Sequence, residues 1–394
     1  SRGLGDVYKR QFPLWYNQET EGVRTDARVC NLSYLQTDWY IDQMRRPAYD
    51  SPSLPISWTR LQYVTGTREG IPVQPDALQQ VIDYYKDSPE DLKQMLGDNP
   101  YELKNIIRHW VLNDNPDLQI FPTDSIVVTV DKEAVKRSGM MIAADSIPDV
   151  MHISLKGKRA IYKSEMMMLE MISQANWERP LYMSTTVGPD NYGHLGDNFV
   201  QEGLACRITP FDTKQSGRTI DSERMYNNMM NKFKYGGLKE NPDIYLDETV
   251  IRMCYTHRRL FNQLAQQLLK EGQKDKALKV LQRAEEEIPG SIVPHEAFYG
   301  HSLELADAWL ALGHKAEAEK LLNAVGQNAK EYIEWYLSLN TQRLLQSSRE
   351  CLMQIYILND IAKTWEPIDK KKAETYRMEV NNYASRCHQR GMSL

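Results

Sequence analysis

A glycine-rich loop in the first half of the sequence holds residue types that could bind a ligand. Residues 188–197 (GPDNYGHLGD) follow a predicted strand, the position at which nucleotide-binding loops lie. The loop contains neither G-x-G-x-x-G nor G-x-x-x-x-G-K-[ST], the usual phosphate-binding patterns. His194 is its one residue that titrates near neutral pH. The sequence leaves two interpretations open, a ligand site around His194 or a structural turn.

Two aspartates form a second candidate group. Asp38 and Asp42 lie four positions apart on a predicted helix with Trp39 and Tyr40, so that both carboxylates share one helix face. Paired carboxylates are the groups that sugar-cleaving sites use. Alternatively, one of the two stabilises the start of the helix near Thr37.

No other combination of residues predicts catalysis. The eight histidines and five cysteines are scattered, without H-E-x-x-H, C-x-x-C or another zinc spacing, and G-x-S-x-G does not occur. We therefore expect no catalytic residue, no metal site and no cofactor. The cysteines are expected to be small buried side chains, with the formation of one pair left open.

The elements that must position these groups mix strands with helices. Residues 125–130 (SIVVTV), 151–155 and 180–187 are predicted strands, and residues 163–177 are a methionine-rich helix. Residues 27–35 predict a further short strand. Because a helix is the usual crossover between parallel strands, the order predicts a mixed α/β layer with parallel neighbours.

From about residue 247 the strand signal ends and helical spacing continues to the end of the chain. Small, apolar and helix-ending residues recur there in the order of the tetratricopeptide pattern, in which small residues allow two helices to approach closely. The first unit has Leu264, Ala265, Gly272, Ala277, Leu281, Ala284 and Pro289, and the second has Leu305, Ala306, Trp309, Gly313, Ala318 and Leu322. Residues 342–390 predict a further helix pair that caps the array.

Arrays of this type bind an extended peptide or a neighbouring domain along their first helices. Arg259, Asn262, Gln266 and Asp307 are the candidates for such a protein-binding face in this sequence. The alternative is that these residues are ordinary solvated polar side chains.

Composition narrows the class of protein. The 394 residues are 41% apolar and 26% charged, which is typical of globular domains, and the net charge of −5 argues against nucleic acid or an anionic membrane as partner. No window is apolar for the length of a membrane span. We expect a soluble chain with two domains.

The first residues differ in character from the rest of the chain. Residues 1–11 resemble the translation of a sequencing adapter found at the ends of proteins from assembled environmental DNA, and are expected to be a non-native leader. The predicted organisation is therefore residues 1–11 as leader, 12–246 as an α/β domain without its start, and 247–394 as the helical array with its cap.

Two segments carry a family resemblance. FPLWYNQETEGVRTDARVCNLSYLQTDWYIDQM (Phe12–Met44) and DSERMYNNMMNKFKYGGL (Asp221–Leu238), together with the helical tail, are similar to the carboxy-terminal region of large Bacteroidetes-type membrane proteins grouped with protein O-mannosyltransferase-like glycosyltransferases. In that family a block of membrane helices is thought to transfer sugar from a lipid-linked donor. A tail of α/β and tetratricopeptide-like parts lies outside the cytoplasmic membrane.

The resemblance implies a function for this chain. It would be the extracytoplasmic (periplasmic) tail of a glycosyltransferase, inactive without the membrane block, with that block and an acceptor protein or peptide as partners. The α/β layer would lack its first strand, and no catalytic residue carries over. Two alternatives stay open, a free-standing scaffold for protein–protein interaction and a sugar- or nucleotide-binding α/β enzyme domain.

Overall fold

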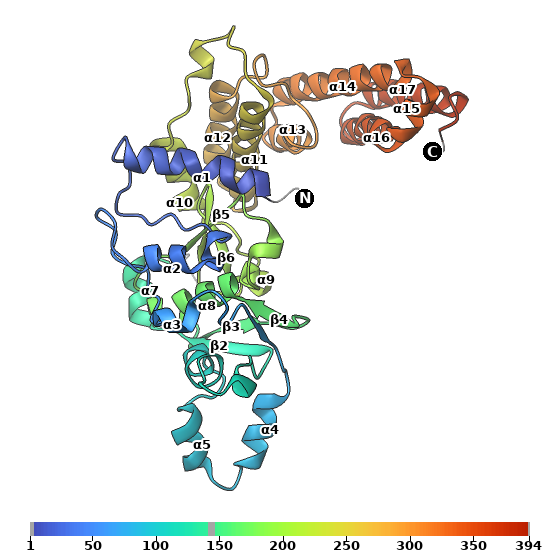
Figure 1. Cartoon of the computed structure of the whole chain (residues 1–394). Coiled ribbons are helices and arrows are strands. Elements are labelled where there is room, and N and C mark those ends of the chain that lie inside the picture. The colour runs from blue at the N-terminus through green and yellow to red at the C-terminus, as the bar shows by residue number, and fades with distance from the viewer. Residues whose placement is uncertain (1–3, 141–145, 393–394) are drawn as a thin grey trace. The chain divides into compact units, whose positions relative to one another are not determined.

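The computed structural model describes residues 4–140 and 146–392. The chain divides into two compact units, Ser1–Asp221 and Ser222–Leu394 (Figure 1). The first unit mixes strands with helices and the second is helical, so the predicted mixed domain followed by a helical one is confirmed at this level. Residues 222–246 belong to the helical unit by this division.

The strands in the described part of the first unit form three small sheets. β1 (Gly70–Pro72) pairs with β4 (Ala160–Tyr162), β2 (Ser125–Thr129) with β3 (Val150–Ser154), and β7 (Ala205–Ile208) lies between β5 (Tyr182–Ser184) and β6 (Phe199–Gln201). All of these pairings are antiparallel. The expected parallel layer is therefore wrong, because the helix after β4 leads into a different sheet and does not cross over within one sheet.

The predicted strand at residues 27–35 is also wrong. The side chain of Asn31 accepts hydrogen bonds from the backbone N–H groups of Ser33 (2.8 Å) and Tyr34 (3.2 Å), and a 3₁₀ turn follows at Tyr34–Gln36. An asparagine that bonds its own backbone in this way favours a turn over a strand ladder.

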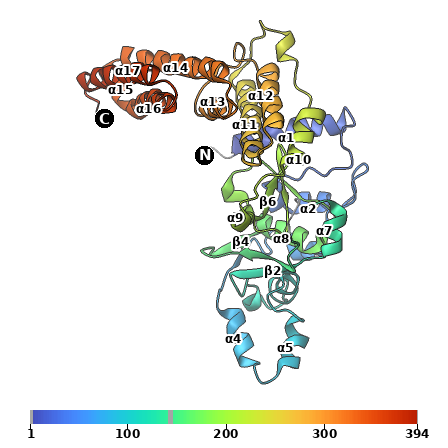
Figure 2. The same ribbon diagram turned by 180° about the vertical axis from the view of Figure 1, so that it is seen from behind.

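The longest helix in the core of the first unit is α8 (Lys163–Ala175), whose methionines are buried there. This placement confirms the predicted helix at residues 163–177 and explains its composition, since methionine fills irregular core gaps. The other α-helices described in this unit are α1 (Leu4–Glu19), α2 (Asp38–Met44), α3 (Arg60–Tyr63), α4 (Ala77–Tyr84), α5 (Pro89–Leu96), α6 (Leu103–Ile106), α7 (Lys132–Ser138) and α9 (Thr213–Ser216). Helices α4 and α5 project away from the sheets of this unit (Figure 2) and share a small separate core.

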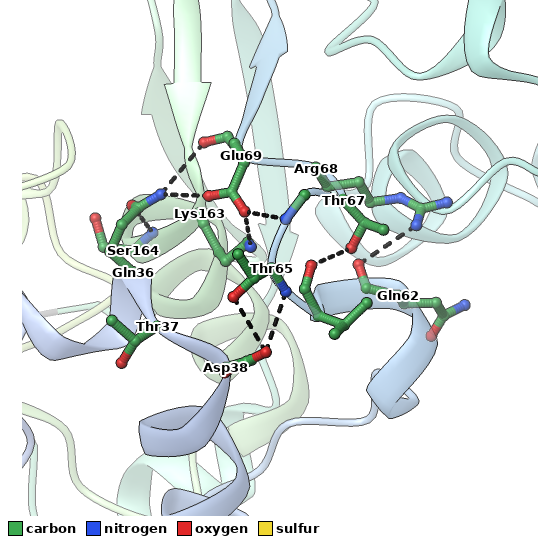
Figure 3. A network of polar contacts seen from close by, with 12 residues as sticks. Gln36, Thr37, Asp38, Gln62, Thr65, Thr67, Arg68, Glu69, Lys163 and Ser164 are labelled. Carbon is green, nitrogen blue, oxygen red and sulfur yellow. Dashed lines mark hydrogen bonds and ion pairs between the residues drawn. The ribbon is translucent and has the colours of Figure 1, made fainter.

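An ion pair between the buried Lys163 and the exposed carboxylate of Glu69 fixes the start of α8 (Figure 3). Lys163 is 0% exposed and donates from Nζ to Oε1 of Glu69 at 2.6 Å, while its backbone N–H donates to the Glu69 carbonyl. The same carboxylate accepts the backbone N–H of Gly66 at 2.8 Å and the amide of Gln36 at 3.1 Å. Gln36 also accepts the backbone N–H of Ser164. Three segments that are distant in sequence therefore meet at one charged group.

The second unit consists of successive helices, with long connections before α11 and α13 and short connections between the others (Figures 1 and 2). They are α10 (Ser222–Asn227), α11 (Glu248–Lys270), α12 (Lys274–Glu287), α13 (Ser302–Ala311), α14 (Lys315–Ser338), α15 (Thr341–Gln346), α16 (Ser348–Trp365) and α17 (Lys370–Gln389). The small residues of the periodic pattern, Ala265, Ala277, Ala306 and Ala318, are all 0% exposed. Helix pairs thus lie where the pattern predicts them, while their tetratricopeptide type stays a prediction.

The connection between the two predicted repeats is held by one buried arginine. Arg258 of α11 is 1% exposed, and its guanidinium donates to the carbonyls of Ile288, Val293 and Pro294 at 2.8–3.1 Å. These bonds satisfy carbonyl groups that would otherwise be buried without a donor. The extra residues between the repeats therefore form an ordered loop. Among the described residues no helix is long and apolar enough to cross a membrane.

We predict that replacing Glu69 by Gln destabilises the first unit by about 2 kcal/mol, because the buried Lys163 ammonium loses its carboxylate. The measurement is urea unfolding at neutral pH. The double variant Glu69→Gln/Lys163→Met should regain part of the loss. Glu133→Gln, which breaks the exposed pair with Lys136, is the control and should cost less than about 0.5 kcal/mol.

The same pair predicts a pH dependence. The hydrogen bond from Lys163 holds the pKa of the Glu69 carboxyl below its ordinary value of 4.5. A carboxyl with a lowered folded-state pKa contributes stability above that ordinary value, and the contribution is lost as the pH falls through the folded-state pKa. The gap between wild type and Glu69→Gln should therefore narrow below about pH 4. A gap that stays constant with pH would contradict the role assigned to the pair.

Candidate functional site

The first unit contains an open cleft with a volume of about 1410 Å³. Three segments line it. They are the solvent side of β3 with the turn that follows it, the glycine-rich loop at 189–198, and residues 210–218 around α9. The predicted loop at 188–197 is therefore one wall of a cavity, and His194 lies in that wall.

Strand β3 forms one side of the cleft because its side chains alternate. Met151 and Ile153 are 0% and 1% exposed and belong to the core, so that His152 and Ser154 face the opposite way and line the cleft. This is the period-two pattern of a strand with one buried face. His152 is thereby held on a rigid element.

The glycine-rich loop is pressed onto helix α8. Gly193 has a φ of +55°, and a Cβ at this position would overlap Cε of Met168 on α8. The next residue, His194, also has a positive φ, +64°, a region in which histidine is more common than most residues. Backbone strain of this kind clusters at binding sites. Here it places the exposed imidazole of His194 on the wall of the cleft.

The third wall is tied to the loop by hydrogen bonds. Thr213 Oγ1 donates to the Asp197 carbonyl at 2.8 Å, and the buried Asn198 amide donates to the Phe211 carbonyl at 3.1 Å. Asp212 caps α9 by accepting the backbone N–H of Gln215 at 2.8 Å. These contacts join the two walls into one framework.

Several polar groups of the cleft have no partner within the described residues. The side chains of His152, Asp190, His194, Asp197 and Gln215 make no hydrogen bond or ion pair there. Partial loss of solvent and the nearby Lys158 ammonium lower the pKa of His194, which favours the neutral imidazole at neutral pH. A neutral imidazole both donates and accepts a hydrogen bond. The cleft therefore offers donors and acceptors to a polar ligand.

The second predicted group, Asp38 and Asp42, lies outside the cleft. Asp38 is in the first turn of α2 and accepts the backbone N–H and the hydroxyl of Thr65, both at 3.1 Å (Figure 3). Asp42 accepts the Tyr63 hydroxyl at 2.5 Å, and both carboxylates approach Arg60. The backbone N–H of Thr65 is the main cause that lowers the pKa of Asp38. The structure thus surrounds the pair with partners and does not join it to His194.

The predicted protein-binding residues lie on two helices of the second unit. Arg259, Asn262 and Gln266 are on α11, and Asp307 is on α13. Gln266 donates to the Glu304 carbonyl of α13 at 2.9 Å, so the two helices pack together. Arg259 makes no hydrogen bond or ion pair with any described residue. The residue Asn262 is 6% exposed, and its Oδ1 accepts no hydrogen bond from the described residues.

Asp307 has a distinct electrostatic environment on the same face. Partial loss of solvent and the nearby Glu304 carboxylate raise the pKa of Asp307. The structure therefore brings the four predicted residues onto neighbouring helices.

Sequence reasoning missed four groups of the cleft, His152, Asp190, Asp197 and Gln215. The alternation of β3 contained the signal for His152, since the apolar residues on either side of it face the core. Asp190 and Asp197 lie in the same glycine-rich loop as His194. Their lack of partners is a tertiary property that spacing does not show.

A comparison with known protein families shows which family the chain belongs to. The sequence model of the family TMEM260-associated domain 2 matches residues 4–228, more than half of the chain, and the chain belongs to this family. The match supports the relation to protein O-mannosyltransferase-like proteins. Comparisons with curated proteins and with solved structures find no significant match.

We predict that Gly193→Ala destabilises the first unit by about 1–3 kcal/mol more than Gly157→Ala. Both glycines have a positive φ, but a Cβ at Gly157 would meet nothing within 4 Å, so the difference isolates the contact with Met168. Thermal unfolding of the two variants is the measurement. Adding Met168→Ala should reduce the difference, and equal losses in the two glycine variants would show that the loop does not rest on α8.

Proposed function

We propose that this chain is an accessory region of a membrane-bound protein O-glycosyltransferase of the O-mannosyltransferase type, and that it binds acceptor protein for that enzyme. The observation that carries the proposal is the family match over residues 4–228. TMEM260 itself is a protein O-mannosyltransferase. The sugar-transfer chemistry belongs, in this proposal, to a membrane domain that works with the chain outside the cytoplasmic membrane.

The face formed by α11 and α13 supports acceptor binding. The guanidinium of Arg259 is half-buried and makes no hydrogen bond or ion pair with any described residue, which is costly unless a ligand completes its hydrogen bonds. A polypeptide backbone offers carbonyls to this guanidinium. The first helices of consecutive helix pairs are also the surfaces on which helical arrays hold extended peptides.

The test separates binding from catalysis. The purified chain should transfer no mannose from a polyprenyl-phosphate donor to a serine- and threonine-rich acceptor polypeptide, but should bind that polypeptide in a fluorescence anisotropy titration. Arg259→Ala should weaken binding about tenfold, the size of one lost charge-assisted hydrogen bond. Arg349→Ala is the matched control, because Arg349 is an exposed arginine of α16 that has no partner within the described residues.

Two results would overturn the proposal. Mannose transfer by the chain alone would make it the enzyme itself. Equal affinity of the Arg259 and Arg349 variants would show that the acceptor does not bind the α11 and α13 face. Binding of folded partner proteins without any preference for acceptor polypeptide would favour a general scaffold.

A further inference from the structure

We propose that the cleft of the first unit binds the neutral sugar of an O-glycosylated polypeptide, the product of the proposed reaction. This inference rests on the proposed function for the source of the sugar. The side chains that line the cleft indicate the chemical class of the ligand.

The charge of the lining argues against the most common alternative, a phosphate-bearing ligand. Carboxylates outnumber cations among the lining residues, with Asp149, Asp190, Asp197 and Asp212 against Lys158 and Arg218. Lys158 is paired with Glu165 at 2.7 Å. A nucleotide or sugar phosphate would therefore bring negative charge to Asp190 and Asp197 with little compensation.

The groups without partners match sugar hydroxyls. Each hydroxyl is one donor and a double acceptor. The carboxylates of Asp190 and Asp197 accept hydrogen bonds from hydroxyls, while the neutral His194 imidazole and the Gln215 amide can both donate and accept. All of these side chains line the same cavity. A neutral polyhydroxylated ligand satisfies this set without burying a new charge.

An aromatic ring completes the polar set. Tyr192 lines the cleft, and its ring packs edge-on against Phe199 with centroids 4.9 Å apart. A ring held in this way presents an apolar surface to the C–H groups of a hexose, while its hydroxyl remains polar. This combination of an apolar body and polar groups is typical of ligand pockets.

The size of the cleft points to a ligand larger than one free sugar. Its volume of about 1410 Å³ exceeds the roughly 300–1,000 Å³ of ordinary small-molecule pockets. A sugar attached to a length of polypeptide fits an open cleft of this size. The polypeptide would extend along the walls while the sugar occupies the polar groups between them.

The test is calorimetric titration of the full chain with four probes: an O-mannosylated peptide, the same peptide without sugar, methyl α-mannoside, and mannose 6-phosphate. The mannosylated peptide should bind at least tenfold more tightly than the other three. The double variant Asp190→Asn/Asp197→Asn should lose at least tenfold in affinity. Asp87→Asn, at an exposed aspartate of the α4–α5 connection, should lose nothing.

The outcomes separate this inference from the proposed function. Tighter binding of mannose 6-phosphate would show that the cleft is an anion site. Equal binding of the two peptides would show that the sugar does not contribute to binding. Both results overturn the inference. The acceptor titration with the Arg259→Ala variant concerns the other unit and can still succeed in either case. Circular dichroism should show unchanged folding, because the side chains of Asp190 and Asp197 are exposed and make no hydrogen bond or ion pair in the described part of the chain.

A different observation carries a second inference in the helical unit. Cys351 of α16 and Cys387 of α17 are both 0% exposed, and their Sγ atoms lie 3.9 Å apart. Cys30, Cys206 and Cys254 are each partly buried and are not near another cysteine within the described residues. We propose that Cys351 and Cys387 form a disulfide that joins α16 to α17. The two thiols react with a small disulfide such as oxidised glutathione, which takes up both protons and leaves as two thiols.

Burial determines when this exchange can occur. It raises the pKa of the Cys351 thiol to about 12, so the thiolate that must attack is rare in the folded chain. The bond should form during folding, before α16 and α17 close over the sulfurs. Refolding in oxidised glutathione, followed by alkylation under denaturing conditions, is therefore the experiment.

The expected result is three alkylated cysteines and a linked peptide pair containing Cys351 and Cys387. Reduction should lower the Tm of the helical unit by about 10 °C, because the bond closes a loop of intermediate length. Cys351→Ala/Cys387→Ala should lose this redox-dependent shift, and Cys30→Ala should keep it. Five alkylated cysteines after oxidative refolding would overturn the inference.

Discussion

The buried ammonium of Lys163 is the constraint on which the first unit depends. Removing a charge from water is costly, so Lys163 can occupy the start of α8 only where the Glu69 carboxylate and its hydrogen-bond partners meet it. This requirement fixes the turn at residues 65–69 and the segment around Gln36 against the first residue of α8. The remaining turns of α8 then extend through the core in one direction.

The position of the glycine-rich loop in the cleft wall depends on how α8 is placed. Met168 lies on α8, and the glycine-rich loop can approach it closely because Gly193 has no Cβ. His194 is the next residue, so its position on the wall depends on the packing of a methionine whose helix is anchored by Lys163. The site is thus built from contacts between segments that are far apart in sequence, and its precision comes from the core beneath it.

Local patterns were sufficient to predict the elements but not their pairing. Residues 125–130, 151–155 and 163–177 were correctly assigned because apolar periodicity and strand propensity act within a few residues. The antiparallel pairing of β2 with β3 depends on which surfaces are covered, which no single segment encodes. The sequence also does not predict that Lys163 is buried, because its partner Glu69 lies in a distant turn. The helices of the second unit were easier to predict because each packs on its neighbour in sequence.

Contacts with distant segments also determine which of the predicted site residues are available to a ligand. Asp38 and Asp42 have the spacing of a paired acid site, but Arg60, Tyr63 and Thr65 occupy their oxygens. His194 was selected from its type and its loop, and its wall position in the cleft supports that choice. A spacing argument identifies groups that could act together, and only the absence or presence of partners shows whether they are available to a ligand.

The two proposed sites differ in chemistry in a way that suits one kind of macromolecule. Arg259 offers a cation, which matches the carbonyl groups of a polypeptide backbone. The cleft offers carboxylates, neutral imidazole and an aromatic ring, which match hydroxyls and C–H groups. A cationic cleft would favour the phosphate of a lipid-linked donor, and the excess of carboxylates argues against that ligand. The sites therefore favour a glycosylated acceptor over the sugar donor as the molecule this chain recognises.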